Sequence, residues 1–496
     1  MDQNNGGILG KINTPTTTVA SGVWSLDSQF EAQSSSIWPL AFPQTTIANS
    51  CRFNSGSSDA LTRDITSNGN KKLFTFSFWV KRSVLGSEQR ILMGDDGGSG
   101  EDFFQFNSND KMKFASANGV SYLLDLDSTR VFRDTSAWYH LVLVYDSAQS
   151  TASNRVKLYV NGEQETLTGT FPAQNNDILF WNTSGADIDI GARTKNSNLY
   201  FNGYLAEFFF IDGQALDPTS FGIFNTVSNI WEPRAYAGTY GTNGFRLDFA
   251  DSSALGNDVS GNNHDFTVNN LTSIDQSTDT CSNNFAVLNP LTNGDSDITL
   301  SQGNLDYTNS GTGDEVVFAS IGVSSGKWYF ETKYTDASQY MDIGVGSANE
   351  GDIGSPRSDA EGTGYYMIQL RTSSPGTRAF DNGSAGSGLG NSALNDINMF
   401  AIDMDNNKFY AGKNGTWYSS GDPANNSNPL ITMDDGFTTL IPIVCGKSNS
   451  AVSVNFGSPS YSISSGNADA NGFGNFEYAV PSGFFAFCTK NLAEHG

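Results

Sequence analysis

The stretch "LFTFSFWVKR", Leu73–Arg82, has a large apolar residue at every second position. Those residues are Phe74, Phe76, Phe78 and Val80. Because successive side chains of a strand point to opposite faces, this period of two predicts a β-strand with one face in a core. A second run, "WYHLVLVYD" at Trp138–Asp146, is apolar in both alternating sets and predicts a central strand with both faces covered.

Strands of the same kind continue toward residue 212. The run "RVKLYVNGE", Arg155–Glu163, leads into Asn161-Gly162, a pair typical of a type I′ hairpin turn. The runs "ADIDIGAR" (186–193) and "FNGYLAEFFFID" (201–212) read as further strands. These runs predict an antiparallel sheet protein in the first half of the chain.

The second half repeats the same unit. "MFAIDMDNNKFYAGKNGTW", residues 399–417, reads as a strand, a turn, a strand opening on a basic residue, and then Asn-Gly, as residues 140–163 do with a longer turn. We interpret this as a weak internal repeat, with one antiparallel sandwich of about 200 residues in each half.

A calcium loop is the rival interpretation of the same run. Asp403, Asp405 and Asn407 occupy the first, third and fifth positions of a helix-loop-helix calcium loop. That loop then needs a glycine and, at its twelfth position, a glutamate, where this chain has Lys408 and Asn414. We therefore predict that the two aspartates end a strand and shape its turn.

Composition favours an all-β protein. The 496 residues include 52 Gly, 35 Phe and 18 Tyr, and only 16% of them are charged. This mixture suits many short strands joined by turns around aromatic cores, in two or three domains. The net charge of −25 would repel nucleic acid and anionic membrane surfaces, so neither is an expected partner.

The start of the chain, "MDQNNGGILGKINTPTTT", has no basic region followed by an apolar core, and no stretch has the ~20 apolar residues that span a bilayer. We expect a soluble protein made in a cytoplasm without a signal peptide. The four cysteines lie far apart without a CxxC motif, which excludes zinc knuckles and redox motifs of that type.

Residues 1–48 are rich in Ser, Thr and Pro and carry isolated large apolar side chains. We interpret them as a docking segment that attaches to another protein, with a disordered tail as the alternative. The expected anchors are Trp24, Leu26, Phe30 and Trp38. The first sandwich is then expected at residues 49–235 and the second at 291–496, joined by a polar linker with some strand at 236–290.

The motifs resemble two branches of one superfamily. "AWYHLVLVYD", "RVKLYVNGE" and "DIDIGAR" resemble the laminin-G-like branch of the concanavalin A-like jelly rolls. "SSGKWYFETKY", "MDIGVGSA" and "SVNFG" resemble a SPRY domain, a second jelly roll of that superfamily. The resemblance implies two jelly-roll sandwiches in tandem, a fold that hosts lectins, hydrolases and scaffolds alike.

The N-terminal stretch with "GGILGKINTPTTT" and "SGVWSLDSQFEAQ" is similar to that of virion structural proteins of marine tailed bacteriophages. This resemblance implies a tail fibre, spike or capsid decoration protein on the virion exterior. Its partners would be other virion proteins, bound through the N-terminal segment, and further copies of itself, for which a trimer is expected.

Candidate binding residues lie in expected rim loops. Aromatic side chains beside amides or carboxylates could stack on sugars, with ordinary packing as the alternative. The candidates are Trp181, Asn182, Tyr365, Tyr366, Trp417 and Tyr418. For a metal, the loop "GDDGGSGED" offers oxygen ligands suited to Ca²⁺, with a solvated hairpin loop as the alternative. Its acidic residues are Asp95, Asp96, Glu101 and Asp102.

Catalytic motifs of serine hydrolases, zinc proteases and P-loop enzymes are missing from the sequence. His140 is expected at a sheet position, and Asp187 and Asp189 share a strand face without the pattern of a glycosidase. We therefore expect no cofactor and a non-enzymatic virion surface protein that adheres to host-surface glycan. The alternatives are a scaffold that binds only virion proteins and a glycan-depolymerising enzyme.

Overall fold

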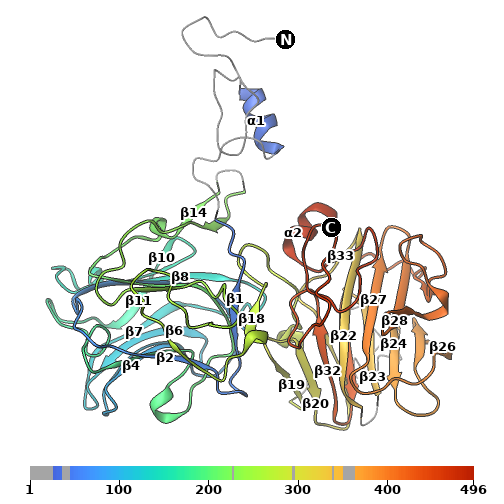
Figure 1. Ribbon diagram of the computed structural model, residues 1–496, viewed down its shortest axis with the longest axis horizontal. Helices are drawn as coiled ribbons and strands as arrows, with labels where there is room; N and C mark the ends of the chain where they lie inside the picture. Colours follow the sequence, from blue (N-terminus) through green and yellow to red (C-terminus); the bar gives the residue numbers. More distant parts are fainter. Residues whose placement is uncertain (1–25, 36–44, 226–227, 293–295, 338–339, 350–362) are drawn as a thin grey trace, which may run out of the picture.

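The computed structural model describes residues 26–35, 45–225, 228–292, 296–337, 340–349 and 363–496, which are almost entirely β-structure. Their strands form two sandwiches that lie side by side, and α1 (Leu26–Ser34) stands apart from both (Figure 1). The prediction of an all-β fold with two sandwiches in tandem is confirmed. Neither α1 nor any other helix of the described residues is long and apolar enough to cross a membrane.

The first sandwich consists of two packed eight-stranded sheets. One sheet has the order β10 (Glu163–Glu165), β9 (Val156–Val160), β8 (Tyr139–Asp146), β3 (Leu73–Arg82), β13 (Gly203–Asp212), β1 (Ser50–Phe53), β18 (Gln276–Ser277), with β16 (Phe245–Leu247) beside β13. The other has the order β11 (Leu167–Thr170), β7 (Tyr122–Val131), β6 (Lys111–Ala117), β5 (Glu101–Phe106), β4 (Gln89–Asp95), β12 (Asp187–Ile190), β2 (Ala60–Asp64), β17 (Thr267–Asn269). A separate hairpin, β14 (Gly222–Phe224) and β15 (Trp231–Pro233), covers part of the first sheet.

The core of this sandwich is built on alternating phenylalanines. Phe76 of β3 stacks on Phe210 of β13 at 4.4 Å, and Phe78 stacks on Phe208 at 4.6 Å. β8 lies between β3 and β9, so the strand expected to be central is central. Cross-strand aromatic pairs of this kind stabilise a sheet beyond the area they bury.

The stretch expected as a linker completes the first sandwich. β16, β17 and β18 all come from residues 236–290 and pair with strands of the first sandwich. Phe266 and Leu271 are buried in its core. The boundary expected at residue 235 is therefore wrong, because the polar stretch after β16 contains β17 and β18, which are the edge strands of the two sheets.

The second sandwich has a nine-stranded and a six-stranded sheet. The larger has the order β19 (Ile298–Ser301), β20 (Asp306–Asn309), β32 (Ser450–Asn455), β22 (Lys327–Ala337), β27 (Ile397–Asp403), β28 (Lys408–Lys413), β29 (Thr416–Trp417), with β30 (Ile431–Thr432) on β28 and β33 (Phe485–Ala486) on β22. The smaller has the order β21 (Asp314–Phe318), β31 (Leu440–Lys447), β23 (Tyr340–Ser347), β24 (Tyr365–Arg371), β25 (Arg378–Asp381), β26 (Ser384–Gly388). Helix α2 (Thr489–His495) follows β33 at the junction of the sandwiches (Figure 1).

The internal repeat is present in the backbone of both sandwiches. Asn161 and Asn414 each have a φ of 49°, and the glycine after each has a φ of 84° and 82°, as the first residues of a type I′ turn require. The Asn161 side chain accepts the amide N–H of His140 at 2.7 Å, and Asn414 accepts that of Ile397 at 2.9 Å. The same hairpin thus ends the corresponding strand pair in each half.

The run with the calcium-like spacing is a strand turn, as predicted. Asp403 ends β27, forms an ion pair of 2.9 Å with Lys327 of β22 and accepts the amide N–H of Asn406 at 3.0 Å. Asp405 accepts the amide N–H of Gly326 at 2.8 Å. Asp403 therefore holds a lysine and its own turn, and Asp405 holds the backbone of Gly326.

The expected anchors of the N-terminal segment are only in part within the described residues. Trp24 and Trp38 lie outside them, and Leu26 is the first residue of α1. Phe30 of α1 is 71% exposed. An exposed phenylalanine on a nine-residue helix is available to a partner. The docking of this segment stays a prediction.

Candidate functional site

Arg52 of β1 joins the two sandwiches. Its side chain is completely buried and donates from Nη2 to the carbonyl of Ile274 at 2.9 Å and from Nη1 to that of Pro459 at 3.1 Å. Its Nε donates to the side chain of Gln302 at 3.2 Å. Ile274 belongs to the first sandwich and Pro459 to the second, so a single guanidinium holds backbone from both.

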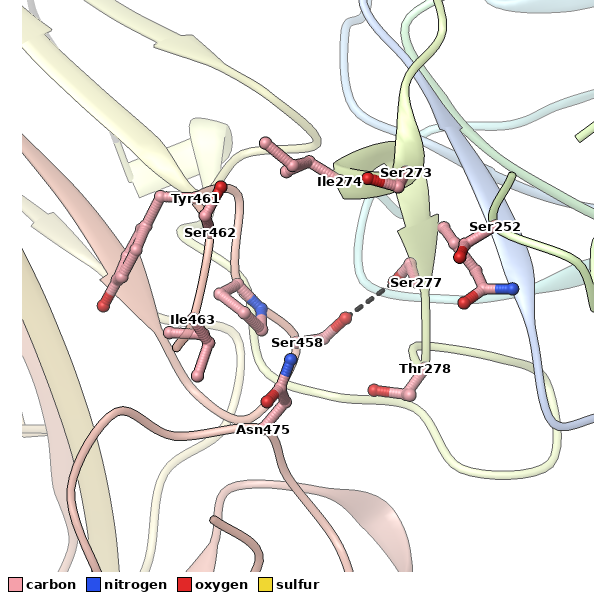
Figure 2. Close-up of a pocket in the computed structure, with 12 residues that line it drawn as sticks. Ser252, Ser273, Ile274, Ser277, Thr278, Ser458, Tyr461, Ser462, Ile463 and Asn475 are labelled. Carbon is pink, nitrogen blue, oxygen red and sulfur yellow. Dashed lines mark hydrogen bonds between the residues drawn. The ribbon is translucent and has the colours of Figure 1, made fainter. Parts of the chain in front are cut away.

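A cleft opens beside this contact, and Figure 2 shows the residues that line it. Its volume is about 390 Å³. Ser277 of β18 and Ser458 face each other across the junction with their hydroxyl oxygens 2.7 Å apart (Figure 2). We call this space the hydroxyl cleft, and its lining residues are Ser252, Ser273, Ile274, Gln276, Ser277, Thr278, Ser458, Pro459, Tyr461, Ser462, Ile463 and Asn475.

The lining of the hydroxyl cleft is polar without charge. It presents hydroxyls and side-chain amides together with the apolar surfaces of Ile274, Pro459 and Ile463. Burial raises the pKa of the Tyr461 phenol well above its usual value, so this ring is neutral at physiological pH. Such a surface suits a neutral ligand with many hydroxyl groups, and it offers no carboxylate, histidine or thiol for acid–base chemistry.

Sequence reasoning did not identify this cleft. Its residues come from two polar runs, "SIDQST" at 273–278 and "SPSYSI" at 458–463, which read separately as ordinary serine-rich loops. The site arises because Arg52 brings the two loops together. The serine density of both runs is the one signal that the sequence contains.

The prediction of a rim site at Trp181 and Asn182 is wrong. Neither residue is exposed: Trp181 stacks on Phe114 at 5.4 Å inside the first sandwich. The Asn182 side-chain amide donates to Asp212 at 3.0 Å and to the carbonyl of Asn70 at 2.9 Å. Asn182 therefore hydrogen-bonds to the backbone of Asn70, and the Trp181 ring packs in the core.

Tyr365 and Tyr366 are likewise not rim residues. They lie in β24 and are 1% and 0% exposed. The Tyr366 hydroxyl donates to the carboxylate of Asp435 at 2.8 Å and accepts the amide N–H of the same residue at 3.2 Å. The predicted ligand role is wrong for this pair because the strand is covered on both faces.

Trp417 and Tyr418 remain candidates for ligand contact. Both are half-buried and directly follow the Asn414-Gly415 turn. The Trp417 ring makes edge contacts with Tyr329 at 6.4 Å and Tyr410 at 6.5 Å. Burial raises the pKa of the Tyr418 phenol to about 12. The predicted binding role of these two residues stays a prediction.

The four acidic residues proposed for calcium do not converge. Glu101 forms ion pairs with Arg90 at 2.9 Å and Arg193 at 2.8 Å. Asp102 is buried, accepts the amide N–H groups of Phe180 at 2.6 Å and of Trp181 at 3.0 Å, and burial raises its pKa to about 6.

The other two aspartates hold the turn between β4 and β5. Asp95 accepts the amide N–H of Gly97 at 2.7 Å, and Asp96 accepts that of Gly98 at 2.9 Å. Within the described residues, no group of three or more His, Cys, Asp or Glu side chains could hold a metal ion. The metal prediction is wrong because Glu101 and Asp102, consecutive in β5, point to opposite faces, and Asp95 and Asp96 bond to the turn amides.

His140 is a structural residue in β8. Its Nδ1 accepts the indole N–H of Trp231 at 3.0 Å. Because an indole only donates, Nε2 carries the ring proton and donates it to the Ser77 hydroxyl at 2.9 Å. Burial lowers the pKa of His140 to about 3. A base that must accept a proton from Ser77 would need a free Nε2, so this serine–histidine pair is not a nucleophile with its base.

The Asp187 and Asp189 pair does not present two carboxyls to one ligand. Asp189 is 2% exposed and accepts the hydroxyl of Thr194, whereas Asp187 is exposed. Burial raises the pKa of Asp189 to about 6. In Asp187, burial and the neighbouring Asp64 and Asp95 also raise the pKa. Asp187 and Asp189 are therefore neighbouring residues of β12 whose carboxyl pKa values are both raised.

Comparison with known proteins identifies one domain type. Residues 54–219 match the family model described as "Concanavalin A-like lectin/glucanases superfamily". The match spans the body of the first sandwich and agrees with its laminin-G-like resemblance. Among curated proteins, none matches the chain.

Solved structures with a similar fold cover about a third of the chain each. The SPRY domain of human HERC1 is 19% identical, with a TM-score of 0.26 over 34% of this chain and 96% of that one. The TRIM65 PSpry domain is 16% identical, with a TM-score of 0.27 over 34% and 91%. A heptameric SAP-like pentraxin from Limulus polyphemus is 14% identical, with a TM-score of 0.26 over 35% and 79%.

Proposed function

We propose that the protein is a non-enzymatic virion surface component that displays two lectin-like sandwiches and binds host-surface glycan in the hydroxyl cleft. The observation that carries the binding role is the uncharged lining of that cleft, in which hydroxyls and amides lie beside the apolar surfaces of Ile274, Pro459 and Ile463. Sugars present the same combination of hydroxyl groups and apolar C–H faces.

The virion role rests on the N-terminal stretch that resembles those of phage structural proteins. In this proposal Trp24 and the exposed Phe30 attach the chain to neighbouring virion proteins. The net charge of −25 keeps closely spaced copies soluble. The assembled form is a homo-oligomer, for which we propose a trimer.

Glycan binding is tested on the full chain with an array of neutral and acidic host-envelope glycans. Ser462→Trp adds a large side chain at the exposed mouth of the cleft and is expected to reduce binding at least tenfold. Ser121→Trp makes the same change in the exposed turn before β7 and is expected to leave binding unchanged. Trp417→Ala tests the remaining candidate pair from the sequence, Trp417 and Tyr418.

Three results would change the proposal. Loss of binding in Trp417→Ala with full binding in Ser462→Trp would place the glycan site at Trp417, at the end of β29, instead of in the hydroxyl cleft. An array without signal from a folded oligomer would leave the scaffold role. Release of reducing ends from host polysaccharide would replace the binding role with hydrolysis. Antibody labelling of intact virions against the second sandwich tests the location, and unlabelled particles would contradict it.

A further inference from the structure

A second cleft lies at the junction of the sandwiches and has a different chemistry. It is bounded by three tryptophans, Trp79, Trp138 and Trp231, and has a volume of about 540 Å³. Its lining also includes the polar residues Asn161, Asn229, Asn284 and Thr489 and the charged residues Arg130 and Glu163. We call it the tryptophan groove. The tryptophans come from β3, the approach to β8, and β15, on the outer face of the first sheet.

The rim of the tryptophan groove exposes large apolar side chains. Ile230 is 60% exposed and Phe224 is 39% exposed, on the β14–β15 hairpin. Phe224 packs edge-on against Trp231 at 4.9 Å, which makes the hairpin an extension of the tryptophan cluster. Large exposed apolar side chains beside a tryptophan cluster are typical of a place where another segment packs.

The chain itself already enters this cluster. Ile47 is 5% exposed and packs with Trp79, Trp138 and Trp231. Both backbone polar groups of Ile47 are hydrogen-bonded. The Ser282 hydroxyl accepts its amide N–H at 2.9 Å, and the Thr280 hydroxyl donates to its carbonyl at 2.9 Å. Ile47 thus anchors the described chain at the tryptophan cluster.

The sequence just before Ile47 has the chemistry that the groove requires. Residues 36–44, "SIWPLAFPQ", lie outside the described residues and contain no charge. Five peptide units separate Phe42 from Ile47, which span about 18 Å when extended. The two prolines favour an extended backbone and lack N–H groups, so few backbone donors of this segment would need a partner in the groove.

We propose that the tryptophan groove binds the Ile37–Phe42 segment of the same chain. The tether through Ile47 supplies an effective concentration in the millimolar range, so a modest apolar contact is sufficient. This docking holds the N-terminal segment against the first sandwich on the side where α1 and β14 lie (Figure 1). In this proposal Trp38 binds within its own chain, and Trp24 and Phe30 are available to bind a partner protein. The proposal is independent of glycan binding in the hydroxyl cleft.

Hydrogen exchange of the full chain tests the groove. Amides of residues 37–42 are expected to exchange at least tenfold slower than those of an unbound peptide, and to lose this protection in Ile230→Asp. Ile230 is 60% exposed, so the change leaves the core intact. Val120→Asp alters a 96% exposed apolar residue elsewhere and is expected to keep the protection. Unprotected amides in the unaltered protein would overturn the proposal.

A cross-link identifies the occupant. Thr489 lines the groove and is exposed, whereas burial raises the pKa of the Cys281 thiol. In a Cys281→Ser background a short bismaleimide is expected to join Leu40→Cys to Thr489→Cys within one chain, and the product disappears when Thr489→Cys is left out. Thr16→Cys, farther along the N-terminal stretch, is expected to give little product. A cross-link only between two chains, or equal yields from both positions, would overturn docking within the chain.

Discussion

Lys81 and Asp279 form an ion pair of 2.7 Å in which both side chains are almost completely buried, at 1% and 2% exposure. Lys81 also donates to the side chain of Asn284 at 2.7 Å and to the carbonyl of Phe285 at 3.3 Å. The other carboxylate oxygen of Asp279 accepts the indole N–H of Trp138 at 3.1 Å. The ammonium group of β3 thus fixes the chain at the point where it passes from the first sandwich to the second.

Breaking this pair is expected to cost much more than breaking an exposed one. Asp279→Asn leaves the Lys81 ammonium buried without its counter-charge and should lower the free energy of unfolding by about 3–5 kcal/mol. Lys72→Met removes the pair with Asp177, in which both partners are about half exposed, and should cost less than about 1 kcal/mol. Urea unfolding of both variants makes the comparison, and equal losses would contradict a buried role for Lys81.

Arg52 is expected to determine whether the two sandwiches unfold together. Arg52→Met keeps the apolar stem but removes the donors to the part-buried carbonyls of Ile274 and Pro459, at about 1 kcal/mol each. Calorimetry should then resolve two transitions in place of one. Arg155 also donates to three carbonyls, but all lie within the first sandwich, so Arg155→Met should lower stability without separating the transitions.

The strand alternation in the sequence predicts the sandwiches because it depends on local geometry alone. Phe74, Phe76 and Phe78 face the core, as their period requires, and the two Asn-Gly turns adopt the dihedral angles expected of them. Lys81 is buried, although a lysine near the end of a strand normally reaches solvent. Its burial depends on Asp279, nearly 200 residues away, which no local pattern encodes.

The site residues were harder to predict for the same reason. An aromatic residue beside Asn or Asp occurs both in rim loops and where a core meets buried backbone, as at Trp181. Only the facing sheet determines which case applies. The hydroxyl cleft needs two serine-rich loops from different sandwiches, and Ser277 and Ser458 meet only because the sandwiches are fixed against each other.

Packing around Trp181 gives a prediction for a neighbouring glycine. A Cβ added at Gly94 would lie 2.5 Å from Cδ1 of the Trp181 ring, which is held on its other side by Phe114. Gly94→Ala should therefore destabilise the first sandwich by about 1–3 kcal/mol through overpacking. At Gly313 a Cβ would have no heavy atom within 4 Å, and Gly313→Ala should change stability by less than about 0.5 kcal/mol. Thermal unfolding of both variants measures the difference.

The buried His140 should make stability depend on pH between 7 and 5. Burial lowers its pKa from 6.5 to about 3, so in this range the unfolded chain binds a proton that the folded protein does not. Stability is therefore lost as pH falls through 6.5, by about 2 kcal/mol at pH 5 from this residue alone.

The test compares urea unfolding at both pH values in three proteins. His140→Gln retains a donor and an acceptor for Ser77 and Trp231 but cannot titrate, so its free energy of unfolding should fall by about 2 kcal/mol less than that of the unaltered protein between pH 7 and pH 5. His264→Gln keeps His140 and should show the full decrease. An identical pH dependence in His140→Gln and the unaltered protein would mean that His140 is protonated in the folded protein. That result would contradict the hydrogen bond in which His140 Nδ1 accepts the Trp231 indole N–H.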